Sequence, residues 1–220
     1  MAVDWASLLE RAQERVGDGE RRLDASRDSD SRQRQLTRLG NAASAAGLCL
    51  LMVGRRDEAR DWFARAAARW RESYDLAPPG SWGRPIGAIK ACVLGGDWPG
   101  ARAYAEWTLA EDAAASDSPI GRYAACLALL VLGRDDEARR ISASLRGRRD
   151  FPADVADALA ALGVGDEADY ARAAAEVLTS FEAREDYLED VPVADTVLVL
   201  QALAAERGMA VELESPLLPA

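Results

Sequence analysis

Histidine is absent from the 220 residues of this chain, and lysine occurs only once, as Lys90. Without histidine the chain cannot build Ser-His-Asp or Cys-His catalytic groups, histidine-ligated zinc or haem, or a histidine-based pH switch. Lys90 lies in no GxxxxGK[ST] segment, which excludes a P-loop. We therefore predict no catalytic residue, no cofactor and no metal site, and we expect the protein not to be an enzyme.

Cysteines and long apolar runs are also scarce. Cys49, Cys92 and Cys126 form no CxxC pair, so neither a disulfide framework nor a zinc site is indicated, and we interpret them as small core residues. The longest apolar run, 42–53, is shorter than the ~20 residues of a membrane span. The first residues have neither the basic nor the apolar region of a signal peptide. These absences predict a cytoplasmic protein with no membrane partner.

Acidic residues outnumber basic ones by 37 to 27, giving a net charge of -10, which argues against a general nucleic-acid binder. The excess lies at one end, because residues 150–220 carry 16 acidic and 3 basic side chains. Four acids there recur at helical spacing with a fifth beside them: Glu182, Glu185, Asp186, Glu189 and Asp190. Two interpretations remain open, a solvated surface or a docking face for a basic partner protein.

Four related segments begin with glycine and carry alanine at the sixth position. They are Gly54–Arg60, Gly96–Arg102, Gly133–Arg139 and Gly163–Asp169, and the first and third are identical at six of seven positions. Each follows an apolar stretch and precedes a stretch with helical periodicity, so we predict a helix-turn-helix corner at each. A left-handed glycine would end the first helix, and the alanine (Ala59, Ala101, Ala138 or Ala168) would let the second helix approach closely.

The abundance of alanine and the scarcity of isoleucine and phenylalanine favour helices throughout. Start and stop signals predict helices over 3–16, 32–53, 57–75, 84–94, 98–112, 119–132, 136–146, 152–162, 166–188 and 192–207. Residues 25–31 and 77–85 are predicted loops, and 210–220 an extended tail. The predicted fold is all-α, a single domain (1–220) of stacked antiparallel helical hairpins. An N-terminal helix and linker (1–31) precede about four hairpins (32–188), and a capping helix and tail (189–220) follow.

Several positions resemble the tetratricopeptide repeat (TPR) family over residues 40–190. Gly47, Gly54, Ala59, Phe63 and Ala66 match its alternating small and large positions in the first copy, and Gly133 and Ala138 match it in the third. The repeat intervals are irregular, and the family's leading Trp-Leu pair and its proline after the second helix are missing. The resemblance implies a TPR-like α-solenoid that binds other proteins.

The C-terminal sequence Asp195–Pro219 resembles the end of all-helical immunity proteins from bacterial polymorphic toxin systems. That resemblance implies a protein that neutralises a cognate toxin. Our first hypothesis is therefore a non-enzymatic protein-interaction module of this kind, acting through its acidic C-terminal face. A regulatory or assembly TPR-like adaptor is the alternative, and a carboxylate-based enzyme or small-molecule binder is a third.

Trp82 and Arg84 lie together in the predicted loop 77–85, where a tryptophan beside an arginine is a good interface anchor. The other interpretation of Trp82 is that it folds back onto the seam between the first two repeats. The predicted partner-binding residues are accordingly Trp82, Arg84, Glu182, Glu185, Asp186, Glu189 and Asp190. The acid pairs Glu111-Asp112, Asp135-Asp136 and Glu189-Asp190 are the candidates for the enzyme alternative.

Overall fold

The computed structural model describes residues 3–219, which form ten α-helices and two short 3-10 helices and contain no strand. The α-helices are α1 (Trp5–Ala25), α2 (Ser29–Met52), α3 (Arg56–Leu76), α4 (Gly83–Leu94), α5 (Trp98–Ala110), α6 (Pro119–Val131), α7 (Asp135–Leu145), α8 (Ala153–Val164), α9 (Glu167–Glu182) and α10 (Asp195–Ala205). The 3-10 helices are η1 (Ala113–Ala115) and η2 (Leu188–Asp190). The predicted all-α fold is confirmed.

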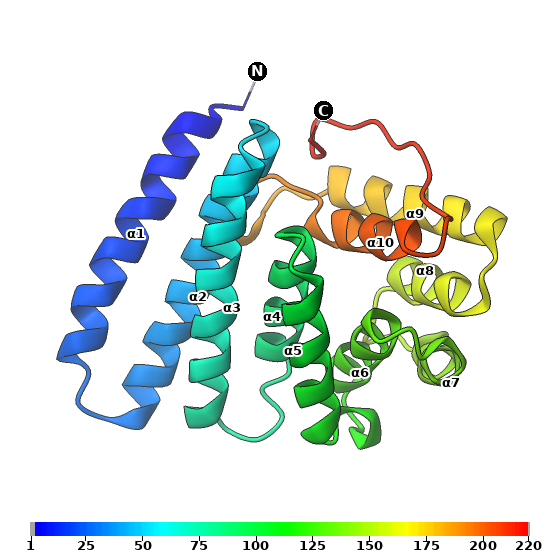
Figure 1. Ribbon diagram of the computed structural model, residues 1–220, viewed down its shortest axis with the longest axis horizontal. Helices are drawn as coiled ribbons and strands as arrows, with labels where there is room; N and C mark the ends of the chain where they lie inside the picture. Colours follow the sequence, from blue (N-terminus) through cyan, green and yellow to red (C-terminus); the bar gives the residue numbers. More distant parts are fainter. Residues whose placement is uncertain (1–2, 220) are drawn as a thin grey trace.

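The helices stack as four antiparallel hairpins, α2 with α3, α4 with α5, α6 with α7 and α8 with α9 (Figure 1). Helix α1 packs outside the first hairpin against α2. The leading helices also contact one another across hairpins, α4 with α6 and α6 with α8. Their buried side chains join into one continuous hydrophobic core, as expected of hairpins that are each too thin to bury their own apolar face.

The four hairpin corners share one backbone geometry. Gly54, Gly96, Gly133 and Gly165 have φ values of 77°, 69°, 68° and 77°, the left-handed conformation that glycine adopts without steric cost. The residue after each glycine donates its N–H to the carbonyl five residues earlier, at 2.9 to 3.1 Å, which closes a Schellman motif. At the first three corners the predicted alanine is fully buried.

The fourth corner differs from the prediction. Gly163 lies inside α8, where an added Cβ would stand 3.2 Å from the backbone nitrogen of Arg139, and the turn falls two residues later at Gly165. Ala168 is consequently exposed. The position five residues after the turn glycine belongs instead to the fully buried Tyr170. The sequence match aligned the wrong glycine because two glycines stand close together here.

Two predicted helix ends at the N-terminal side are also wrong. Helix α1 continues to Ala25, well beyond residue 16, and α2 begins at Ser29. The side chain of Asp28 caps α2 by accepting a hydrogen bond from Ser31 N at 2.8 Å. The predicted linker 25–31 therefore shrinks to a short connection between two long helices.

Helix α9 ends at Glu182, not at residue 188 as predicted. Continuing the helix would have aligned like charges at i, i+3 and i+4, which weakens a helix. The hydroxyl of Tyr187 instead donates to the carbonyl of Phe181 at 2.7 Å and turns the chain back. The carboxylate stripe expected on one helix face is therefore not formed.

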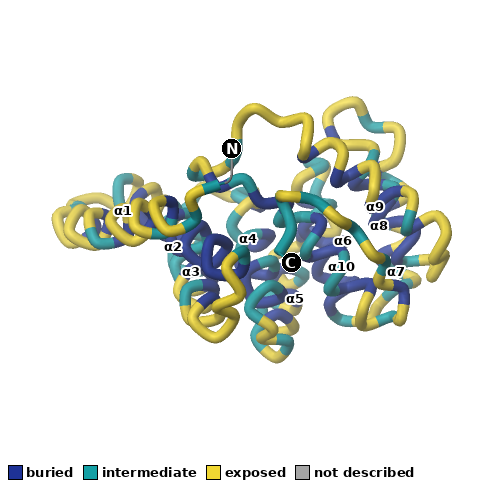
Figure 2. Tube along the Cα trace, turned by 90° about the horizontal axis from the view of Figure 1, so that it is seen from above, coloured by how far each residue is buried: buried dark blue, intermediate teal, exposed yellow. Residues whose placement is uncertain are grey.

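Helix α10 lies against the inner side of the stack, where it contacts α4, α8 and α9. Helix α6 is buried at every position from Ala124 to Val131, and its Leu130 carbonyl accepts a hydrogen bond from Arg207 just after α10. Seen from above, α1 is largely exposed along its outer edge, and the buried segments lie toward the interior of the stack (Figure 2). The tail after α10 is extended, as predicted, and Leu217 accepts a hydrogen bond from Ala194 N at 3.0 Å. Within residues 3–219, no helix combines the length and apolarity required to cross a membrane.

Candidate functional site

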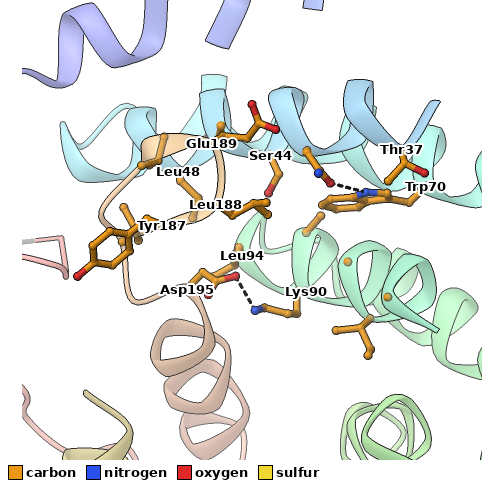
Figure 3. Close-up of a pocket in the computed structure, with 18 of the residues that line it drawn as sticks. Thr37, Ser44, Leu48, Trp70, Lys90, Leu94, Tyr187, Leu188, Glu189 and Asp195 are labelled. Atoms are coloured by element: carbon orange, nitrogen blue, oxygen red, sulfur yellow. Dashed lines mark hydrogen bonds and ion pairs between the residues drawn. The ribbon is translucent and has the colours of Figure 1, made fainter. Parts of the chain in front are cut away.

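A cavity of about 340 Å³ opens on the inner face of α2 and α4, beside the start of α10. Its walls come from α2, α4 and the connecting segment 183–194 between α9 and α10, with Trp70 of α3 between the two helices (Figure 3). We call it the groove cavity. It is lined by Thr37, Asn41, Ser44, Ala45, Leu48, Trp70, Gly83, Arg84, Ile86, Gly87, Lys90, Ala91, Leu94, Phe181, Arg184, Tyr187, Leu188, Glu189, Val191, Val193 and Asp195.

The indole of Trp70 is held between two glycines. A Cβ at Gly40 of α2 would stand 2.6 Å from Trp70 Nε1, and one at Gly87 of α4 would stand 2.8 Å from its six-membered ring. Trp70 Nε1 donates to the side-chain oxygen of Asn41 at 3.1 Å. The two glycines thus let a large aromatic side chain form part of the cavity wall without separating α2 from α4.

Lys90 and Asp195 form an ion pair at the boundary between the cavity and α10. The two side-chain atoms lie 2.5 Å apart, and Lys90 also donates to the hydroxyl of Thr196 at 3.1 Å. Burial alone would lower the pKa of Lys90, but Asp195 and, more weakly, Tyr123 outweigh it, so the pKa is raised. The pair fastens the start of α10 to α4.

Arg84 lies at the end of the cavity nearest Thr37 and is bound only by neutral groups. Its Nε donates to Ser73 Oγ at 2.8 Å, and its Nη2 donates to the side-chain oxygen of Gln33. Ser73 is fully buried and also hydrogen-bonds to Thr37. Burial lowers the pKa of Arg84, and no carboxylate among residues 3–219 pairs with it.

The connecting segment is held against α1 by Arg15. The guanidinium of Arg15 donates to the backbone oxygen of Glu189 at 3.1 Å, to its carboxylate at 2.7 Å and to Asp190 at 3.1 Å. Glu189 and Asp190 both have left-handed backbones, with φ values of 57° and 62°. Such conformations are uncommon for residues other than glycine and persist where surrounding contacts enforce them. We call this arrangement the Arg15 clamp.

The seven predicted partner-binding residues separate into three groups. Arg84 and Glu189 line the groove cavity, and Asp190 joins the Arg15 clamp beside it. Trp82 is buried between Tyr74 and the start of α6, which agrees with the interpretation that it folds back. The remaining three, Glu182, Glu185 and Asp186, are exposed. Glu182 accepts a hydrogen bond from the hydroxyl of Ser215 at 2.7 Å.

In each carboxylate pair named for the enzyme alternative, at least one member is engaged in a structural contact. Glu189 and Asp190 both bind Arg15, and Asp135 accepts from Arg207 at 2.5 Å. Glu111 accepts from Trp107 Nε1 at 3.2 Å. Among residues 3–219, no group of three or more His, Cys, Asp or Glu side chains has the arrangement of a metal site.

The three cysteines are buried, as predicted for core residues. Burial raises the pKa of Cys49 to about 11 and those of Cys92 and Cys126 to about 12. Thiols with such values stay protonated at neutral pH and are poor nucleophiles.

Sequence reasoning missed most of the cavity. Thr37, Asn41 and Ser44 interrupt the apolar α2 at helical spacing, and the single lysine falls in the apolar α4. Both patterns mark polar groups facing an interior space. The contribution of Arg15 had no local signal, because its partners lie more than 170 positions later.

A comparison of the chain with protein families, with curated proteins and with solved structures finds no match. The fold and the geometry described above therefore carry the functional argument.

Proposed function

We propose that the protein is a non-enzymatic protein-interaction module whose acidic C-terminal surface docks a basic partner protein. The surface consists of Glu182, Glu185 and Asp186 together with Glu214, which is exposed and precedes the serine bound to Glu182. An immunity protein that neutralises a cognate toxin is the specific form of this function suggested by the resemblance of the C-terminal sequence. The TPR-like resemblance of the repeats supports protein binding in general.

The observation that carries the proposal is the fixed position of the acidic segment. Glu185 and Asp186 project from a connection whose start is secured by the Tyr187–Phe181 hydrogen bond and whose far side is secured by the Arg15 clamp. A segment held in this way loses little conformational freedom on binding, which favours affinity.

The position of α10 favours this outer surface over the inner groove. Helical repeat proteins commonly bind partners on their concave face. Here α10 packs on that face against α4 and α8, and the groove cavity beside α2 remains open. A groove-binding adaptor therefore has less support than a protein that docks its partner through the acidic surface.

Co-purification from the native host supplies the partner for the decisive test. Association driven by the acidic surface is electrostatically steered, so raising salt from about 50 to 500 mM should slow the on-rate about tenfold while changing the off-rate much less. The double variant E185R/D186R should weaken binding at low salt and leave the unfolding midpoint nearly unchanged, because both side chains are exposed.

The matched control is E10R/E14R, which reverses two exposed acids of α1 without touching the acidic surface. The control should bind like the original protein. A partner that is itself acidic, or that binds E185R/D186R and the original protein equally well, would rule out the proposed docking surface.

A further inference from the structure

We infer that the groove cavity is a binding site for a small amphipathic organic anion, a carboxylate or sulfonate attached to an elongated apolar body. This site is separate from the acidic surface proposed above. The inference rests on how charge, hydrogen-bond donors and apolar side chains are distributed along the cavity.

Two arginines that line the cavity, Arg84 and Arg184, form no ion pair among residues 3–219. Arg184 is exposed and lies over the ring of Phe181, whereas Arg84 is half-buried. Two carboxylates line the cavity, and each already has a cation: Asp195 has Lys90, and Glu189 has Arg15. Arg84 is oriented by Ser73 and Gln33, which are neutral acceptors, so it keeps its whole positive charge. A half-buried guanidinium fixed in this way favours an anion that reaches it.

Two half-buried side chains of the cavity lining have NH₂ groups without a hydrogen-bond partner among residues 3–219. The amide of Asn41 uses its oxygen to accept from Trp70, and its NH₂ group has no partner among residues 3–219. The Nη1 group of Arg84 likewise donates to no described residue. Each of these unused NH₂ groups can donate a hydrogen bond to an oxygen of an anion bound in the cavity.

The α2 and α4 walls become more apolar away from Arg84, and the charged groups Lys90, Asp195 and Glu189 that also line the cavity are already paired. Along α2 the lining changes from Thr37 and Asn41 to Leu48, and along α4 it changes from Arg84 to Leu94. With a rise of 1.5 Å per residue, Thr37 and Leu48 lie about 16 Å apart along the helix. The exposed Leu188 reaches over the middle from the connecting segment.

The volume and length of the cavity limit the kind of ligand that can fit. A volume of about 340 Å³ lies in the range of small-molecule sites, which are mostly apolar with a few placed polar groups. The length and the polar-to-apolar gradient fit a single anionic head near Arg84 and an unbranched or aromatic body extending toward Leu48 and Leu94.

Isothermal titration calorimetry with decanoate, decyltrimethylammonium and acetate, each below its micellar concentration, tests the site. Decanoate should bind with one-to-one stoichiometry and at least tenfold more tightly than the cation of equal chain length, whereas acetate should not bind measurably. Equal affinity for the two amphiphiles, or no binding of decanoate at 1 mM (about -4 kcal/mol), would overturn the inference.

Three variants locate the site. R84Q should weaken decanoate binding tenfold or more, R84K should retain most of it because the charge remains, and Ser44→Leu should block both amphiphiles by filling the cavity. R149Q removes an exposed arginine outside the cavity and should bind like the original protein. Each variant is first checked for an unchanged circular dichroism spectrum. Binding by R84Q at the original affinity would contradict the proposed anion contact even if decanoate occupies the cavity.

Discussion

The inner face of the stack is lined by the leading helices of the hairpins, but one part of it is covered by another helix and the other part is open. Helix α10 covers the face beside α8 and part of α4, and Arg207 just after it donates to the carbonyl of Leu130 in α6. Beside α2 and the remaining part of α4 the face stays open as the groove cavity. The covered helix α6 is apolar at every buried position from Ala124 to Val131. The open helix α2 instead places Thr37, Asn41 and Ser44 toward the cavity. In α2, therefore, the polar interruptions mark the part of the inner face that no other helix covers.

The largest expected effect comes from weakening the packing of α10 on the covered part of the inner face. Leu203 of α10 is fully buried, whereas Leu188 at the open half is 68% exposed. Leu203→Ala should lower the free energy of unfolding by about 2–5 kcal/mol, because it leaves a cavity, whereas Leu188→Ala should cost less than about 0.5 kcal/mol. Urea denaturation measures both. Equal losses would mean that α10 does not close its half of the face.

The hairpin corners provide the next comparison, because they should behave alike in both halves. Ala59 belongs to the open half, Ala138 belongs to the covered half, and both are fully buried. Replacing either with leucine should overpack the hairpin and cost about 1–3 kcal/mol. The exposed Arg65 and Ala168 serve as controls, and the same replacement there should change stability by less than about 0.5 kcal/mol. A large loss of stability from Ala168→Leu would show that Ala168 is buried, as the corner predicted at Gly163 requires.

The corners and the hairpins could be predicted from the sequence because their causes are local. A glycine, the alanine five positions later and the periodicity on either side specify a Schellman turn and a close helix crossing within about a dozen residues. The same locality explains the error at the fourth corner, where Gly163 and Gly165 are both plausible turn residues. Only the packing of Tyr170, whose hydroxyl donates to Gln201 of α10 at 2.8 Å, distinguishes them.

The site could not be predicted in the same way because its contacts join distant parts of the chain. The Lys90–Asp195 pair spans 105 positions, and the contact of Arg15 with Glu189 spans 174. Both depend on the curvature of the stacked hairpins, which brings segment 183–194 back to α1 and α2. Arg84 was singled out from the sequence, but as an exposed anchor beside Trp82. Because α4 begins at Gly83, Arg84 lies in the first turn of this helix, where its side chain points toward Ser73.

The Lys90–Asp195 pair lies where the open and covered halves meet, and its pH dependence gives the finest test of that boundary. In the original protein the folded-state pKa of Lys90 is raised, so the stabilisation from the pair is complete below about pH 10 and is lost only as the pH rises further. Asp195→Asn removes the negative charge that raises the pKa of Lys90, so in this variant burial lowers the pKa of Lys90. The variant should lose about 1–2 kcal/mol at pH 7, because it leaves a largely buried ammonium group without its counter-charge.

Because the lysine of the variant can lose its proton in the folded state, that deficit should shrink between pH 7 and pH 9.5 while the original protein stays nearly constant. Chemical denaturation of both proteins across this range measures the difference, and the tyrosines with raised pKa values do not titrate within it. Asp154→Asn is the matched control, since it removes an acid from the first turn of α8 that has no lysine partner. Its deficit should not change with pH. If the loss of stability in Asp195→Asn is also independent of pH, Asp195 stabilises only the start of α10. The electrostatic link between Lys90 of α4 and α10 would then be ruled out.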